Sequence, residues 1–160
     1  MTEKVEEAKA LAAARAVADH FSPSFRFVGI GSGTTIVYVI NEIKRVLGQD
    51  KVGSQLFVPT GYQSRAAIVS AGLTPVAFDT LPDDVVLDVA FDGADEVDEE
   101  LNCIKGGGAC LFQEKLVAEM ARKFVCVAGE LFLISMYPRR HHLVFEDVGM
   151  RWIGADIVCN

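Results

Sequence analysis

The sequence predicts an α/β fold in which a parallel sheet carries helices on both faces, the arrangement called Rossmann-like. Short continuous apolar runs alternate along the chain with segments whose apolar residues recur at helical spacing. Continuous apolar runs are typical of parallel strands, because helices cover both faces of such a sheet. The chain has 160 residues, of which 51% are hydrophobic, so it can bury the core of one domain.

Five apolar runs are expected to be strands: residues 27–30, 55–58, 75–78, 85–91 and 124–128. The fourth run gives the strongest strand signal, because Asp88 is its only polar residue. These strands would form the parallel sheet.

Four segments are expected to be helices: residues 3–21, 35–47, 62–70 and 114–123. In the second segment Ile36, Val39, Ile40 and Ile43 share one face, which would pack on the sheet. Gly72 is placed to end the third helix, because glycine favours the left-handed conformation that follows many helices.

Composition excludes several classes of function. The net charge is −7, whereas proteins that bind nucleic acid need an excess of Lys and Arg to neutralise phosphates. No apolar run approaches the ~20 residues that cross a bilayer. Acidic residues near the N-terminus (Glu3, Glu6 and Glu7) are untypical of a signal or transit peptide, so we expect a cytosolic protein.

The four cysteines form no CxxC pair, which favours reduced thiols. Only three histidines are present, which favours the absence of a metal site.

Ligands of such sheets bind beyond the carboxyl ends of the strands. Three segments are expected to lie at such ends: Gly29 to Thr35, Asp92 to Asp98, and the glycines from Gly106 to Gly108. In the first, Gly29 to Thr35, glycines allow close approach of an anion to a helix N-terminus, and Ser32, Thr34 and Thr35 add hydroxyls around Gly33. Thr34 replaces the last glycine of a dinucleotide motif and no Walker lysine is present, so a phosphate monoester fits better. The alternative is a plain turn capped by Ser32 or Thr34, and this loop by itself leaves both open.

In the second segment, Asp92 and Asp95 flank Gly93 and Ala94, two small residues that let a ligand approach the backbone. Carboxylates at this place can bind sugar hydroxyls or transfer a proton, and neighbouring carboxylates would push their pKa values apart. The remaining acidic residues, from position 96 to position 100, are expected to form a solvated loop.

The third segment places a cation and a carboxylate on either side of a glycine loop. Three glycines (Gly106, Gly107 and Gly108) favour close approach to a ligand, since each would cost about 1 kcal/mol inside a helix or strand. Lys105 precedes them, and Glu114 lies on the helix that follows. Glu114 considered alone would be interpreted as an ordinary surface residue.

Together, the three segments resemble the type A ribose-5-phosphate isomerases in order and spacing. The resemblance covers roughly residues 5–128. It implies interconversion of D-ribose 5-phosphate and D-ribulose 5-phosphate through an enediolate, in the non-oxidative pentose phosphate pathway. Such a reaction needs a base and electrostatic support for the enediolate, but neither a metal nor a nucleotide cofactor. The expected partner is therefore the small-molecule substrate, and the resemblance also suggests a homo-oligomer.

The resemblance implies a role for each matching residue. Glu114 would be the proton-transferring base, Lys105 the cation near the reacting oxygens, and Asp92 and Asp95 the carboxylates that hold the sugar and assist ring opening. The other substrate-binding residues would be Ser32, Gly33, Thr34, Thr35, Gly93, Ala94, Gly106, Gly107 and Gly108.

After Ala128 the resemblance ends, and residues 129–160 are expected to be a tail outside the family pattern. The family would continue with more strands and a small second domain, so residues 1–128 are expected to be an incomplete catalytic domain. Residues 131–136 could add an edge strand. The alternative to an active isomerase is an inactive sugar-phosphate-binding or unstable fragment, for which a homo-oligomer is doubtful. A plastid location is the alternative to the cytosol.

Overall fold

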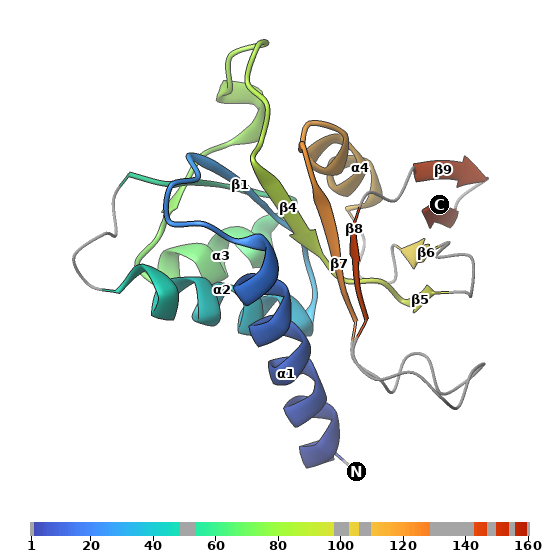
Figure 1. Cartoon of the computed structure of the whole chain (residues 1–160). Helices are drawn as coiled ribbons and strands as arrows, with labels where there is room; N and C mark the ends of the chain where they lie inside the picture. Colours follow the sequence, from blue (N-terminus) through green and yellow to red (C-terminus); the bar gives the residue numbers. More distant parts are fainter. Residues whose placement is uncertain are drawn as a thin grey trace.

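The structure is a computed structural model that describes residues 2–48, 54–97, 103–105, 110–128, 143–146, 150–153 and 156–159. These residues form a six-stranded sheet with helices on both faces and a smaller four-stranded sheet beside it (Figure 1). None of the described helices is both long and apolar enough to span a membrane.

The main sheet has the strand order β3-β2-β1-β4-β7-β8. Its strands are β1 (Phe27–Ile30), β2 (Leu56–Pro59), β3 (Thr74–Pro75), β4 (Val89–Asp92), β7 (Phe124–Ala128) and β8 (Leu143–Glu146). The first five are mutually parallel, which confirms the predicted sheet, whereas β8 pairs antiparallel with β7. Strands β1 and β4 lie side by side, so the loops that follow them share one edge.

Helices cover both faces of this sheet, as predicted (Figure 1). They are α1 (Thr2–His20), α2 (Thr34–Leu47), α3 (Tyr62–Ser70) and α4 (Leu111–Glu119). Strand β7 shows how the two faces divide: Val125 and Val127 pack in the cluster that contains α1, α2 and α3, while Phe124 and Cys126 pack with α4. The α2 face predicted to be apolar is buried, and each large aliphatic side chain there contributes about 1.5–3 kcal/mol.

Two predicted strands are shorter in the structure. The third ends at Pro75, because a 3₁₀ turn at Phe78–Thr80 follows, in which the Thr80 N–H and hydroxyl both donate to Ala77 O. The fourth begins at Val89 rather than residue 85. Before it, Leu87 makes only an isolated bridge to Ala121.

The fourth predicted helix is displaced toward the N-terminus. It begins at Leu111, directly after Cys110, whose φ of 73° is left-handed. It ends at Glu119, because Met120 O and Arg122 N then bond to the backbone of Leu87. The third helix has the predicted bounds, and Gly72 follows it with a φ of 80°.

The smaller sheet is antiparallel and has the order β5-β6-β10-β9. Its strands are β5 (Glu96–Val97), β6 (Cys103–Lys105), β9 (Met150–Ile153) and β10 (Asp156–Cys159). Cys103 Sγ lies 4.0 Å from Cys126 Sγ, so β6 packs directly on the main sheet. Residues 131–136, where an edge strand was expected, lie outside the described residues. The domain boundary after residue 128 stays a prediction, although β8 pairs with β7 and β10 pairs with β6, and both β7 and β6 precede it.

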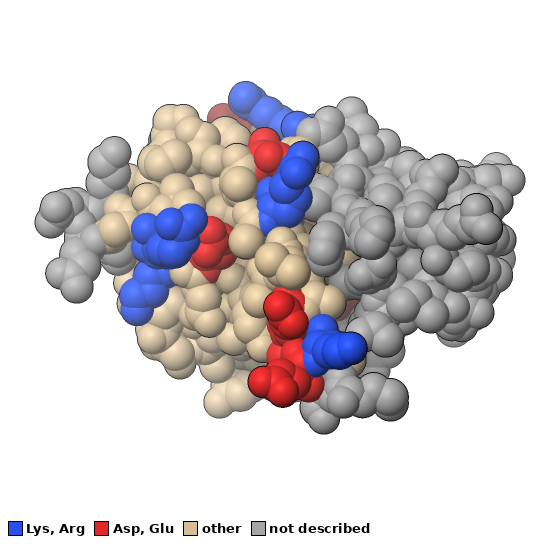
Figure 2. Space-filling view, turned by 60° about the horizontal axis from the view of Figure 1, so that its bottom comes forward, with Lys and Arg blue, Asp and Glu red and all other residues tan. Residues whose placement is uncertain are grey.

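Charged side chains lie in small groups of mixed sign on the face shown in Figure 2. Among the described residues of that face, no broad basic area of the kind that binds nucleic acid is present.

Candidate active site

One pocket at the carboxyl edge of the main sheet collects the segments singled out in the sequence. Its volume is 160 Å³. Its lining residues are Ser32, Gly33, Thr34, Thr35, Asp92, Gly93, Ala94, Asp95, Lys105, Glu114, Val127 and Ala128. All predicted site residues within the described parts of the chain are in this group, while Gly106, Gly107 and Gly108 lie outside those parts.

Three charged side chains meet at the bottom of this pocket from three different elements. Asp92 ends β4, Lys105 ends β6, and Glu114 lies in the first turn of α4. Lys105 Nζ lies 2.8 Å from Asp92 Oδ2 and 3.3 Å from Glu114 Oε2, and it donates a hydrogen bond to Gly93 O. All three side chains are at most 5% exposed. Charges this deeply buried persist only when they are paired, so one cation here serves two carboxylates.

Burial and this pairing shift the ionisation of the group. Desolvation raises the pKa of Asp92 to about 6; Lys105 opposes the rise and the carboxylate of Glu114 adds to it. Burial by itself would lower the pKa of Lys105, but the negative charges of Asp92 and Glu114 outweigh it and raise that pKa. The carboxylate that acts on Asp92 is therefore Glu114, whereas the sequence had suggested Asp95.

The glycine loop holds the carboxylate of Asp92 from the other side. Asp92 Oδ1 accepts hydrogen bonds from Ser32 N at 3.2 Å and Gly93 N at 2.7 Å. Gly31 N donates to Phe91 O at 2.8 Å, which brings the loop against the end of β4. The loop thus contacts the acidic segment directly.

The N-terminus of α2 faces the same pocket, and no side chain caps it. Gly33 is the N-cap residue with a φ of 94°, a conformation that glycine adopts without strain. The hydroxyl of Ser32 donates instead to Glu114 Oε1 at 2.5 Å, and Thr34 Oγ1 accepts a hydrogen bond from Lys9 Nζ at 2.9 Å. The alternative of a turn capped by Ser32 or Thr34 is therefore wrong. The free N–H groups of the first turn can bind an anion.

Sequence reasoning missed two parts of this region. Lys9 reaches Thr34 from α1 and pairs with Glu6 at 2.7 Å, while Glu6 accepts a hydrogen bond from the Tyr38 hydroxyl at 2.6 Å. Nothing in the local sequence around Lys9 signals this contact across 25 residues. Val127 and Ala128 also line the pocket, and their position at the carboxyl end of a predicted strand could have identified them.

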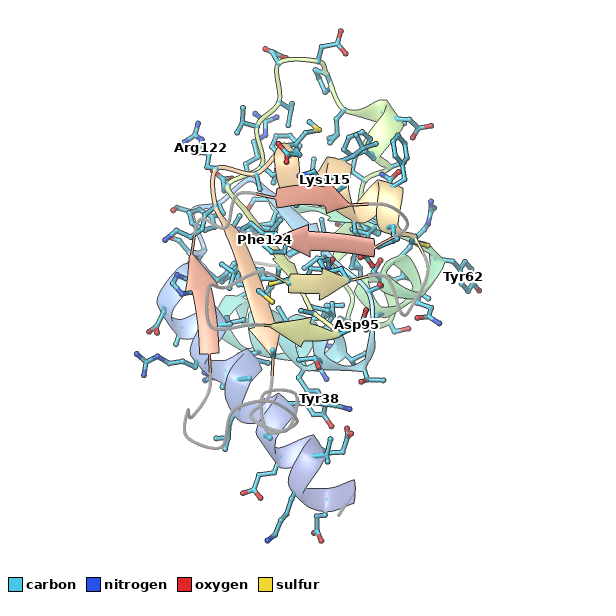
Figure 3. All side chains as sticks on the ribbon, turned by 90° about the vertical axis from the view of Figure 1, so that its right-hand side faces the viewer. Tyr38, Tyr62, Asp95, Lys115, Arg122 and Phe124 are labelled. Carbon is cyan, nitrogen blue, oxygen red and sulfur yellow. The ribbon has the colours of Figure 1, made fainter. Side chains whose placement is uncertain are left out.

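Asp95 lines the pocket on the loop between β4 and β5. In Figure 3 it lies beside the smaller sheet, on the same side of the molecule as Tyr38, whereas Arg122 lies near the opposite edge. Asp95 is a half-buried residue, whereas Asp92 is buried.

Comparison with known proteins identifies the family. The family model of ribose 5-phosphate isomerase A (phosphoriboisomerase A) matches residues 56–142, which is more than half of the chain. The chain belongs to the ribose 5-phosphate isomerase A family. The region that matches this family model includes Asp92, Asp95, Lys105 and Glu114, and it extends beyond residue 128.

Relatives within the family have similar sequences over most of this chain. The chain is 51% identical over 127 residues to ribose-5-phosphate isomerase of Candida albicans, covering 79% of this chain and 50% of the relative. It is 50% identical over 124 residues to the enzyme of Schizosaccharomyces pombe, covering 78% and 43% respectively. The chain therefore spans about half the length of these relatives.

Solved structures of the family share the fold. Ribose 5-phosphate isomerase from Plasmodium falciparum superposes with a TM-score of 0.71 at 28% identity, covering 79% of this chain and 52% of that one. A D-ribose-5-phosphate isomerase in complex with phospho-erythronic acid gives a TM-score of 0.68 at 35% identity, covering 76% and 51%.

Proposed function

We propose that this protein interconverts D-ribose 5-phosphate and D-ribulose 5-phosphate. The observation that carries the proposal is the buried group of Asp92, Lys105 and Glu114 in one pocket with an uncapped helix N-terminus. This combination provides a base, a cation and an anion-binding end within a single cavity. Family membership supports the same reaction, and the similar structure that contains phospho-erythronic acid supports a phosphorylated small molecule as ligand.

The reaction moves a proton between neighbouring carbons of the open-chain sugar. Glu114 takes the proton from the carbon next to the aldehyde, and the electron pair of the broken C–H bond moves to form the enediolate. Lys105 supports the negative charge that develops on the oxygen, as a preorganised cation in a buried site does effectively. Glu114 then returns the proton to the former aldehyde carbon, which gives the ketose.

The remaining site residues bind the substrate. Asp92 and Asp95 hold sugar hydroxyls and assist ring opening. The phosphate binds at the N-terminus of α2, where Gly33, Thr34 and Thr35 offer backbone N–H groups and hydroxyls. Gly106, Gly107 and Gly108 are further substrate-binding residues in this proposal, as the family resemblance implies.

Turnover of ribose 5-phosphate by the purified chain tests this function, and Glu114→Gln tests the base. General-base catalysis typically contributes about 10²–10⁴ in rate, so this variant should lose at least a hundredfold in turnover and keep substrate affinity. Glu119→Gln is the matched control, because Glu119 lies on the same helix with its side chain 58% exposed. An equal loss in both variants would contradict the assignment of the base to Glu114.

The alternative is that the chain binds the sugar phosphate without turning it over. A ligand that binds only the folded state raises the melting temperature. Stabilisation by ribose 5-phosphate without turnover would support this alternative over catalysis. No stabilisation and no turnover would contradict both.

We further infer a cytosolic location, with a plastid as the alternative, and a homo-oligomer. Cys110 and Cys126 form no disulfide, which supports a reducing compartment such as the cytosol. Fluorescence microscopy of the tagged chain tests the location, and light scattering of the purified chain tests the oligomer.

A further inference from the structure

Ser32 contacts both carboxylates of the buried group. It lies between β1 and α2, its N–H donates to Asp92 Oδ1 at 3.2 Å, and its hydroxyl donates to Glu114 Oε1 at 2.5 Å. Asp92 comes from β4 and Glu114 from α4, so the backbone and side chain of one residue connect two elements of the site.

This hydroxyl cannot also hold the phosphate. A serine hydroxyl has one proton to donate, and a phosphate dianion only accepts hydrogen bonds. Because the proton is directed to Glu114, the anion-binding role in this loop falls to the backbone N–H groups of α2 and to Thr34 and Thr35. Ser32 therefore differs in role from its neighbours in the same loop.

The two oxygens of Glu114 consequently have different surroundings. Oε1 accepts the short hydrogen bond from Ser32. Oε2 is buried, lies 3.3 Å from Lys105 Nζ, and accepts no hydrogen bond from the described residues. Within the described part of the chain, Oε2 is thus the oxygen of Glu114 that no hydrogen bond holds, and it differs in this from Oε1.

We propose that Ser32 is a positioning residue that gives the two oxygens of Glu114 different roles. Its hydrogen bond holds Oε1 in place, and Oε2 exchanges the proton with the substrate. When the substrate C–H bond breaks, the proton binds Oε2, and the electron pair enters the enediolate. Oε1 becomes the carbonyl oxygen of the acid and continues to accept from Ser32. The same hydrogen bond thus fixes the side chain before and after proton transfer. This inference rests on the proposed isomerase function.

The kinetic test compares variants at position 32. Ser32→Ala should lower kcat by about 10–100-fold, because small displacements of a catalytic group cost up to about a hundredfold, while KM stays near the wild-type value. Ser32→Thr keeps the hydroxyl and should restore kcat, whereas Ser32→Cys keeps the size with a weak donor and should behave like Ser32→Ala. A raised KM with unchanged kcat would overturn the proposal, because it would make Ser32 a ligand of the substrate.

Ser64→Ala is the matched control. Ser64 is also buried, but its hydroxyl bonds to the backbone of Gly61 at the start of α3. This variant should retain the kcat of the wild-type protein even if its melting temperature falls. A loss of kcat as large as that of Ser32→Ala would overturn the specific role of Ser32.

A second readout does not depend on turnover. The ¹³C resonance of the Glu114 carboxyl group, assigned with Glu114→Gln, should move in Ser32→Ala and return in Ser32→Thr. An unmoved resonance in Ser32→Ala would overturn the contact itself. If the wild-type chain shows no turnover, the proposed function and the catalytic part of this inference are both overturned. The resonance would still decide, in that case, whether Ser32 holds Glu114.

Discussion

Gly31 lies so close to Asp92 that a Cβ atom on Gly31 would stand 2.0 Å from Asp92 Oδ1. The carboxylate occupies the space that any larger residue would need. A glycine at this position therefore lets the buried acid approach the loop, whose Ser32 N–H then binds it.

Gly31→Ala should consequently destabilise the protein. Overpacking of a buried site typically costs about 1–3 kcal/mol of the free energy of unfolding, and Asp92 would be displaced from Lys105. Urea unfolding measures the change. Gly93→Ala is the control, since a Cβ there would meet nothing closer than Val127 O at 3.8 Å. Equal destabilisation by the two substitutions would contradict the close approach of Gly31 and Asp92.

Lys105→Met should be among the most destabilising substitutions in the chain. It leaves the carboxylates of Asp92 and Glu114 buried without their cation, and breaking a buried ion pair from one side typically costs about 3–5 kcal/mol. Chemical denaturation should show this loss. Lys44→Met, on the exposed side of α2, should change the free energy of unfolding by no more than about 0.5 kcal/mol. A Lys105→Met protein as stable as Lys44→Met would show that the group is not buried as described.

Stability should depend on pH through Asp92. Its pKa is raised from 3.8 to about 6 in the folded protein, so its favourable contribution is complete below pH 4 and is lost as the pH rises through 6. A pKa shift of this size corresponds to a contribution of about 3 kcal/mol to the free energy of unfolding. The free energy of unfolding of the wild type, minus that of Asp92→Asn, should therefore decrease by up to this amount between pH 4 and pH 8. A difference that stays constant or increases over this range would refute the raised pKa.

Thr34→Glu should abolish binding of ribose 5-phosphate. The new carboxylate would stand at the N-terminus of α2, where it would both repel the phosphate and occupy its site. Titration calorimetry with ribose 5-phosphate measures the affinity. Thr74→Glu, an exposed threonine of β3 outside the pocket, makes the same change of charge and should bind normally. Unchanged affinity in Thr34→Glu would place the phosphate elsewhere.

The sequence by itself determined the parallel sheet, the helices on both faces and most of the pocket lining. Strand runs and helical periodicity are local properties of the chain, and Gly72, for example, ends its helix through a local backbone preference. The carboxyl ends of parallel strands meet at one edge, so Thr34 and Asp92 could be predicted to share a site before any coordinates were known. Lys105 ends β6 of the antiparallel sheet, and the family resemblance had placed it in the site.

Only the tertiary structure decided which of these groups touch one another. Ser32 and Glu114 are 82 residues apart, and their hydrogen bond depends on how α4 packs across β1 and β4. Lys9 reaches Thr34 because α1 packs along α2, and the start of α4 at Leu111 follows from the left-handed turn at Cys110. Contacts of this kind depend on the packing of whole elements, which the local pattern of apolar and polar residues does not specify.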